Sequence, residues 1–224
     1  MDFCANNVLL PSQSGKFIVT HGNLVKINKD GVQKVAEQIL NAAKDGTLEE
    51  ALFLSPELHP KSGDRNAVQW VFLVDTINFS FWPDEGSHYD VTWNGKTYTG
   101  YFAGCAAVNR ALASGTPMFS AEWMKNVKID EIDAIFKSDS GHSIPLLEER
   151  VKAINESGSV LVDKFGGQFY NLLGKAEKSA QTLLRLVVEH FESFRDFAEF
   201  HGQKGKLLGV GDIHKCKNVA KALN

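Results

Sequence analysis

Hydrophobic residues between positions 30 and 43 recur at the spacing i, i+3, i+4, i+7, i+8, i+11, which places them on one face of an amphipathic helix. Asp30 is a suitable N-cap for this segment, and Gly46 lies just past its end. The pattern therefore predicts a helix capped by Asp30. Its apolar positions are Val32, Val35, Ala36, Ile39, Leu40 and Ala43.

Similar periodicity predicts helices in several later segments. Residues 104–113 and 129–136 each carry apolar side chains at helical spacing. Residues 179–191 are so apolar that we expect them to form a central helix. Residues 160–173 follow the same pattern, but Gly166-Gly167 within them allows either close packing or a break.

One further helix is predicted from its end signals. Ser143 is a suitable cap and Pro145 fits the first turn, where its missing N–H is tolerated. Gly158 is expected to end this helix. Its apolar face carries Leu147, Val151 and Ile154.

The stretch YDVTWNGKTYTGY, residues 89–101, carries the clearest local signal in the chain. Asn94-Gly95 lies between two runs of β-branched and aromatic residues, which predicts a hairpin with a type I′ turn. A two-residue turn also determines which residues face each other. The expected pairs are Trp93 with Lys96 and Val91 with Tyr98.

The apolar run at residues 70–77 is ambiguous, because periodicity alone does not separate a buried strand from a buried helical turn. The elements together predict a mainly α fold with a small β-hairpin element. After His201 the sequence changes to four glycines and five lysines, with little helical periodicity before Val219, which favours a solvated tail.

Composition narrows the class of protein. The 224 residues are 43% hydrophobic and 23% charged, as in an ordinary globular chain, and the net charge of -3 gives no general case for nucleic-acid binding. Three widely spaced cysteines, Cys4, Cys105 and Cys216, argue against a disulfide framework. Without a signal peptide or a membrane-length apolar run, the expectation is a reduced, cytoplasmic protein.

Strong catalytic motifs are absent. The sequence contains no G-x-S-x-G, H-E-x-x-H or P-loop, and no two of its seven histidines lie three or four residues apart. A preformed metal site is therefore not expected. Glu148-Glu149-Arg150 is interpreted as a solvated or salt-bridged helix start, and Lys164 as either an exposed helical lysine or a phosphate contact.

The aromatic segment NFSFW, residues 78–82, is the main candidate for a binding site. A flat heterocycle needs stacking faces and a few hydrogen bonds to its edge. The candidate ligand-binding residues are therefore Asn78, Phe79, Phe81, Trp82 and His88. The alternative is that Phe79 and Phe81 belong to the core, as most such aromatic residues do.

Six short segments are informative when taken together. They are VFLVDT at 71–76 leading into NFSFW, GKTYTGY at 95–101, CAAVNRAL at 105–112, PLLEER at 145–150, KFGG at 164–167 and SAQ at 179–181. Each is modest alone, but in this order they make a specific match. Over residues 17–202 the chain resembles the queuosine salvage family, the queuosine 5′-phosphate N-glycosylases.

The resemblance implies an enzyme that hydrolyses the bond between ribose 5′-phosphate and queuine, a 7-deazaguanine base, so that queuine returns to transfer-RNA modification. It implies a fold like that of helical DNA glycosylases, without metal or organic cofactor. The expected partner is the small-molecule substrate queuosine 5′-phosphate, with no direct tRNA or DNA binding and no membrane association. The resemblance raises the case for residues 78–82 as a wall of the queuine pocket.

The chain departs from the family pattern near its end. Family members carry a further helical segment and an aspartate-centred FADYR-like motif, and neither is found here. We therefore expect a single queuosine-salvage domain over residues 1–201, incomplete at its C-terminus, followed by a divergent tail at 202–224. The catalytic residue stays unknown. Asp75 lies within a matching segment, but its place at the end of an apolar run fits a structural hydrogen-bonding role at least as well. The alternative function is a truncated, non-catalytic form that binds the nucleotide, the base or a partner without turnover.

Overall fold

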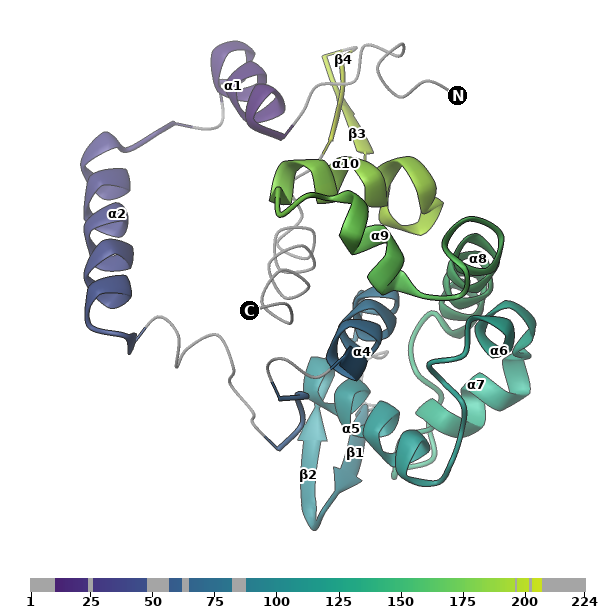
Figure 1. Ribbon diagram of the computed structural model, residues 1–224. Helices are drawn as coiled ribbons and strands as arrows, with labels where there is room; N and C mark the ends of the chain where they lie inside the picture. Colours follow the sequence, from purple (N-terminus) through teal and green to yellow (C-terminus); the bar gives the residue numbers. More distant parts are fainter. Residues whose placement is uncertain are drawn as a thin grey trace. The chain divides into compact units, whose positions relative to one another are not determined.

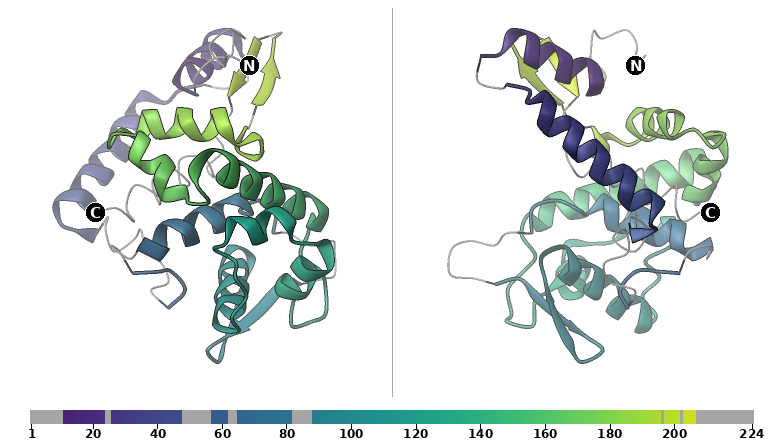
Figure 2. Two further views of the ribbon diagram at one scale, coloured as in Figure 1. Left: turned by 45° about the vertical axis from the view of Figure 1, so that its right-hand side comes forward. Right: turned by 90° about the vertical axis from the view of Figure 1, so that its left-hand side faces the viewer.

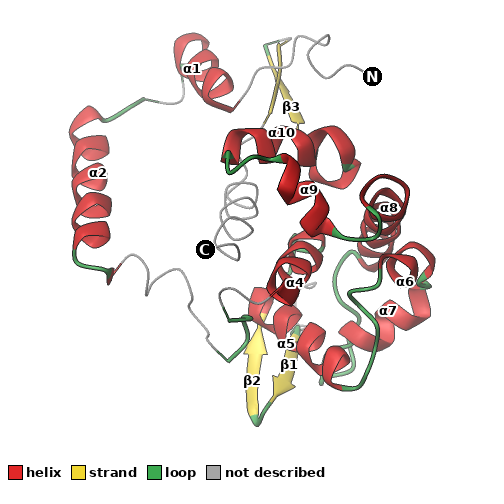
Figure 3. Ribbon diagram, in the orientation of Figure 1, coloured by secondary structure: helices red, strands yellow, loops and turns green. Residues whose placement is uncertain are grey.

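The structure is mainly helical, with two short antiparallel strand pairs (Figures 1 and 3). It is a computed structural model that describes residues 11–23, 26–47, 57–61, 65–81, 88–195, 197–201 and 203–206. The predicted class, mainly α with a β-hairpin, is confirmed in these ranges. The chain divides into two compact units, Met1–Glu57 with Asp196–Leu208, and Leu58–Arg195 with Gly209–Asn224.

In the first unit, helix α1 spans Pro11–His21 and helix α2 spans Lys29–Lys44. The predicted cap of α2 was wrong by two residues. Asn28 is the N-cap, since its side chain accepts a hydrogen bond from the N–H of Gly31 at 2.9 Å, and Asp30 lies in the first turn. The apolar side chains of α2 are largely exposed in this unit: Val32, Val35, Ile39 and Leu40 are each more than half exposed.

Strands β3, Phe197–Phe200, and β4, Gln203–Lys206, also belong to the first unit and pair antiparallel (Figure 1). The segment after His201, expected to be a solvated tail, therefore includes a strand at Gln203–Lys206 that the sequence did not predict. Strand β3 supplies the hydrogen-bonding partners of β4. A lysine-rich segment with glycine does not indicate a strand by its own periodicity. Residues 207–224 lie outside the described ranges.

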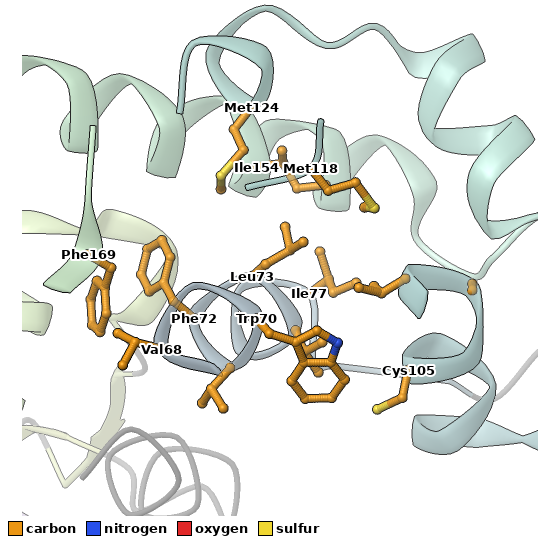
Figure 4. Packing of buried hydrophobic residues seen from close by; sticks show 14 of the residues in the cluster. Val68, Trp70, Phe72, Leu73, Ile77, Cys105, Met118, Met124, Ile154 and Phe169 are labelled. Atoms are coloured by element: carbon orange, nitrogen blue, oxygen red, sulfur yellow. The ribbon is translucent and has the colours of Figure 1, made fainter. Parts of the chain in front are cut away.

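In the second unit, helix α4, Arg65–Thr76, resolves the ambiguity at residues 70–77 in favour of a helix. The run lacks a clear polar face because α4 is covered on several sides, by α5, α8 and α9. Figure 4 shows α4 side chains pointing toward surrounding helices, and the rings of Phe72 and Phe169 stack with centroids 4.1 Å apart. Residues 66–77 are buried almost throughout.

Strands β1, Asp90–Trp93, and β2, Lys96–Thr99, form the predicted hairpin with the predicted register. Asn94 and Gly95 both have positive φ, 49° and 78°, as a type I′ turn requires. The hairpin packs against helix α5, Gly100–Ala113, which follows it directly and is almost continuously buried from Ala103 to Val108 (Figure 2).

Helix α7, Ile129–Phe136, begins and ends where the sequence pattern predicts. The preceding short helix α6, Ala121–Asn126, was not predicted. Ser120 caps α6 by accepting a hydrogen bond from the N–H of Trp123. Six residues are too few for a helical period to stand out in the sequence.

Helix α8, Leu147–Phe165, differs from its prediction at both ends. Ser143 and Pro145 precede the helix, because Leu146 takes a left-handed conformation with φ of 54° and separates them from it. Gly158 does not end the helix but faces α6, where an added Cβ would lie 2.3 Å from the backbone nitrogen of Lys125. Glycine is therefore needed there for close helix packing.

Of the two alternatives for Gly166-Gly167, close packing or a break, the structure shows the break. Both glycines have positive φ and separate α8 from helix α9, Phe169–Lys175. Helix α10, Ala180–His190, is capped by Ser179 and buries Leu183, Val187 and Val188. The short 3-10 helix η2, Glu192–Phe194, follows it.

Candidate functional site

The predicted aromatic site begins in a short non-helical segment, residues 77–81, that directly follows α4. The start of this segment is tied to the last turn of the helix. The N–H of Ile77 donates to the carbonyl of Val74 at 3.1 Å, and the N–H of Asn78 donates to the carbonyl of Asp75 at 3.3 Å. The aromatic positions thus extend from a buried helix end, which limits their freedom.

A single arginine in the first turn of α8 holds this segment. Arg150 is fully buried, and its guanidinium donates hydrogen bonds to main-chain carbonyls on two sides. Its Nε reaches the carbonyl of Pro145 at 2.8 Å, and its Nη1 reaches that of Ile77. Its Nη2 donates to both Phe79, at 2.5 Å, and Ser80, at 2.7 Å. The rigid fork of arginine suits such multiple contacts, which a lysine would not reproduce.

The same guanidinium lies against two aromatic rings. Its central carbon is 4.4 Å from the ring centroid of Phe79 and 4.8 Å from that of Phe81, both within cation–π range. Burial lowers the pKa of Arg150 to about 10, and the nearby Tyr89 and Glu149 oppose that shift. Arg150 therefore remains a cation at neutral pH, compensated by carbonyl dipoles and ring faces.

Phe81 also packs onto α5. A Cβ added at Gly104 would lie 3.0 Å from Cε1 of Phe81. The Phe81 ring therefore approaches α5 at the position where glycine has no side chain. On another side, the Phe81 ring stacks with Tyr89 at a centroid distance of 6.3 Å. Burial raises the pKa of Tyr89 above its ordinary value, so its hydroxyl stays protonated.

Ser80 has an unusual backbone conformation between the two phenylalanines. Its φ is 43°, in the left-handed region that non-glycine residues rarely adopt. Such a conformation costs on the order of 1–3 kcal/mol and persists only where surrounding contacts enforce it. Here the two carbonyls that flank the α-carbon of Ser80, its own and that of Phe79, both bind Arg150.

The structure thus brings together three of the residues predicted for ligand binding. Asn78, Phe79 and Phe81 are half-buried and lie in one segment. The two phenylalanines already serve a structural purpose, because their rings flank Arg150. Both residues are still partly exposed, and their role in ligand binding stays a prediction.

The other two predicted residues are less informative. Trp82 lies outside the described residues. His88 is exposed, and its carbonyl accepts a hydrogen bond from Ser140 Oγ at 3.1 Å. This contact involves the backbone of His88 and not its side chain, so a role of His88 in ligand binding also stays a prediction.

A second cluster of side chains with polar atoms joins α4 and α5. His59 Nε2 is 3.1 Å from the hydroxyl of Tyr101, and its ring lies edge-on to Trp70 at 5.4 Å. Burial raises the pKa of Tyr101, helped by Cys105 and Asp75, and burial raises the pKa of Cys105 to about 12. Both groups are therefore protonated at neutral pH, which makes the Tyr101 hydroxyl able to donate to His59.

Sequence reasoning missed the residue on which the site depends. Arg150 was interpreted as part of a solvated or salt-bridged helix start, and that interpretation was wrong, because its side chain is fully buried. A charge run of the type Glu-Glu-Arg resembles an exposed helix start, so nothing local signals burial. The two glutamates before it are exposed, as expected.

Among the described residues no group of three or more His, Cys, Asp or Glu side chains is arranged to hold a metal ion. Within the same ranges, no helix combines the length and apolar character needed to cross a membrane.

Comparison with known protein sequences identifies the family of this chain. The sequence pattern of the family described as "Queuosine salvage protein" matches residues 58–219, which contain both α4 and Arg150. The chain belongs to the queuosine salvage protein family. The residues that match the family therefore include most of the second compact unit.

The relatives in this family share one name, queuosine 5′-phosphate N-glycosylase/hydrolase. The chain is 45% identical to the Bos taurus protein over 201 residues, which cover 89% of this chain and 59% of the relative. It is 44% identical to the Mus musculus protein over 197 residues, covering 88% and 58%. With the Schizosaccharomyces pombe protein it shares 38% over 212 residues, covering 90% and 61%. The chain thus spans about three fifths of the length of these relatives.

Proposed function

We propose that this protein acts on queuosine 5′-phosphate and hydrolyses its N-glycosidic bond to release queuine. The observation that carries the proposal is the match to relatives named for this activity, which covers 89% of the chain at 45% identity. The mainly helical fold is compatible with a helical DNA-glycosylase-like architecture, which we propose as part of the same hypothesis.

The chemistry of this bond defines what the site must supply. Cleavage builds positive, oxocarbenium-like charge on the ribose and leaves electron density on the departing base. A 7-deaza base lacks N7, the usual protonation point of a purine leaving group. The base must therefore be held by stacking and by hydrogen bonds to its edge. The segment with Asn78, Phe79 and Phe81 offers half-buried aromatic and amide groups suited to that task.

The direct test is base release. Purified protein is incubated with queuosine 5′-phosphate, and free queuine is measured by chromatography with and without a metal chelator. We expect queuine to form at the same rate in both. A preparation that is folded by circular dichroism and releases no queuine would contradict the activity.

A second candidate function is binding of the nucleotide or base without turnover. The half-buried aromatic and amide side chains of Asn78, Phe79 and Phe81 favour it, because stacking and edge hydrogen bonds suffice for binding. Ligand-dependent melting on the same preparation separates the two candidates. A rise in melting temperature without queuine release supports binding alone, whereas release supports hydrolysis.

A further inference from the structure

The contacts of Arg150 determine where two backbone N–H groups point. In a planar trans peptide the C=O and the following N–H point in opposite directions, and the described residues contain no cis peptide bond. The carbonyls of Phe79 and Ser80 both face Arg150 Nη2. The N–H groups of Ser80 and Phe81, which belong to the same two peptides, therefore point away from Arg150.

The left-handed conformation of Ser80 is what puts these two peptides in the same orientation. In an extended segment, successive carbonyls point to opposite sides, and one of them would face away from Arg150. With φ of 43° at Ser80, both carbonyls face the guanidinium, and both N–H groups lie on the other side. Successive N–H groups in such turns form concave sites that bind anions or oxygen acceptors.

Neither donor is used within the described protein. The N–H groups of Ile77, Asn78 and Phe79 each donate to a main-chain carbonyl, but no described residue accepts a hydrogen bond from the N–H of Ser80 or Phe81. Both residues are only half-buried. Partly buried donors of this kind need an acceptor, which water or a ligand can supply.

We propose that the N–H groups of Ser80 and Phe81 form a donor pair that binds the carbonyl oxygen of a flat heterocyclic base, with Arg150 as the residue that positions them. This inference rests on the proposed function and deepens it by assigning the base edge that is recognised. The buried charge of Arg150 is fixed behind the peptides, so it both orients and polarises the donors.

The proposal also addresses the difficulty of the leaving group. When the C–N bond breaks, its electron pair leaves with the base, and conjugation places part of that charge on the carbonyl oxygen. Water adds its hydroxyl to the ribose carbon, and its remaining proton neutralises the base. Preorganised backbone donors stabilise such developing charge without reorganisation, as in an oxyanion hole. No protonation at the missing N7 position is then required.

Backbone NMR of ¹⁵N-labelled protein tests the donor pair directly. Queuine is titrated first, then the same deazapurine ring without its carbonyl oxygen, and then inorganic phosphate as a general oxygen acceptor. We expect queuine to move the amide proton signals of Ser80 and Phe81 downfield. The ring without the oxygen should bind about tenfold more weakly and leave those two signals in place.

The outcomes separate this inference from the proposed function. Queuine shifts that avoid Ser80 and Phe81 would overturn the donor pair while leaving base binding intact. If queuine moves no signals but phosphate moves these two, the N–H groups bind an oxygen anion rather than the base, which overturns this inference together with base binding. If neither compound moves them, the donor pair is refuted.

A matched pair of variants tests the backbone geometry. Ser80→Gly adopts positive φ without strain and should keep queuine affinity within about twofold. Ser80→Val strongly disfavours that conformation and should weaken queuine binding about tenfold or more. Equal affinity of both folded variants would contradict the role of the left-handed turn.

Arg150→Lys keeps the charge without the fork of the guanidinium. Its queuine affinity should resemble that of Ser80→Val. Its melting temperature should recover part of what Arg150→Met loses.

Discussion

Arg150 Nη2 lies 2.7 Å from the carbonyl oxygen of Ser80, although the two residues are 70 positions apart in the chain. This contact joins the first turn of α8 to the segment after α4 and holds a non-glycine residue in a left-handed conformation. The candidate site therefore depends on a buried cation whose described partners are carbonyl groups and aromatic faces.

Replacing this cation is expected to destabilise the fold strongly. Arg150→Met removes the donors of four carbonyl contacts and should lower the free energy of unfolding by about 3–5 kcal/mol, measured by urea denaturation. Arg110→Met is the matched control, since Arg110 forms a partly exposed ion pair with Asp139 and should cost no more than about 1 kcal/mol. Similar losses for both arginines would contradict the buried clamp.

Two glycines in helices should respond in opposite ways to alanine. At Gly158 the new Cβ would lie 2.3 Å from the Lys125 backbone nitrogen, so Gly158→Ala must separate α8 from α6 and should destabilise by about 1–3 kcal/mol. At Gly174 in α9 the new Cβ meets no atom within 4 Å, so Gly174→Ala should stabilise by about 0.5–1 kcal/mol. Thermal unfolding of both variants checks the difference in sign.

The pH dependence of stability should include a contribution from Asp139, which anchors the β1–β2 hairpin. Hydrogen bonding from Thr92, whose backbone N–H lies 2.6 Å from the carboxylate, holds the pKa of Asp139 below its ordinary value, and Arg110 adds to this effect against partial desolvation. The folded state thus binds the proton less tightly than the unfolded state. The stabilisation is present above the ordinary carboxyl pKa of about 4 and is lost as pH falls through the lower folded pKa.

Asp139→Asn removes this titration. Its unfolding free energy should fall less steeply than that of the wild type as pH decreases from about 5 to about 2. Urea denaturation across that range measures the slope. Asp163→Asn is the control, since Asp163 forms a longer, more exposed ion pair with Lys125 at 3.5 Å. A wild-type slope in Asp139→Asn would exclude the predicted contribution.

Cys105 should be chemically inert in the folded protein. Its side chain is fully buried, and burial raises its pKa to about 12, so the reactive thiolate is scarce at neutral pH. Mass-spectrometric peptide mapping after iodoacetamide treatment should find Cys105 unmodified under native conditions and modified in urea. Rapid native modification of that cysteine would show that α5 opens far more readily than its packing indicates.

Local sequence was sufficient for elements whose signals lie within a few residues. Asn94-Gly95 predicted the hairpin and its register because a two-residue turn requires positive φ at both positions. The period of apolar residues located α5 and α7, and Gly166-Gly167 marked the break after α8. The aromatic candidates Phe79 and Phe81 were also visible in the sequence, although their binding role remains a prediction.

Tertiary structure decided the features that depend on distant partners. The apolar run at 70–77 became a helix because neighbouring helices cover it on several sides, which removes the polar face that periodicity needs. Gly158 continued α8 because α6 packs against it too closely for a side chain. Arg150 became a buried clamp because carbonyls of Ile77, Phe79 and Ser80 converge on it. A charged residue in a polar run carries no local sign of such burial, since only the folded chain supplies its acceptors.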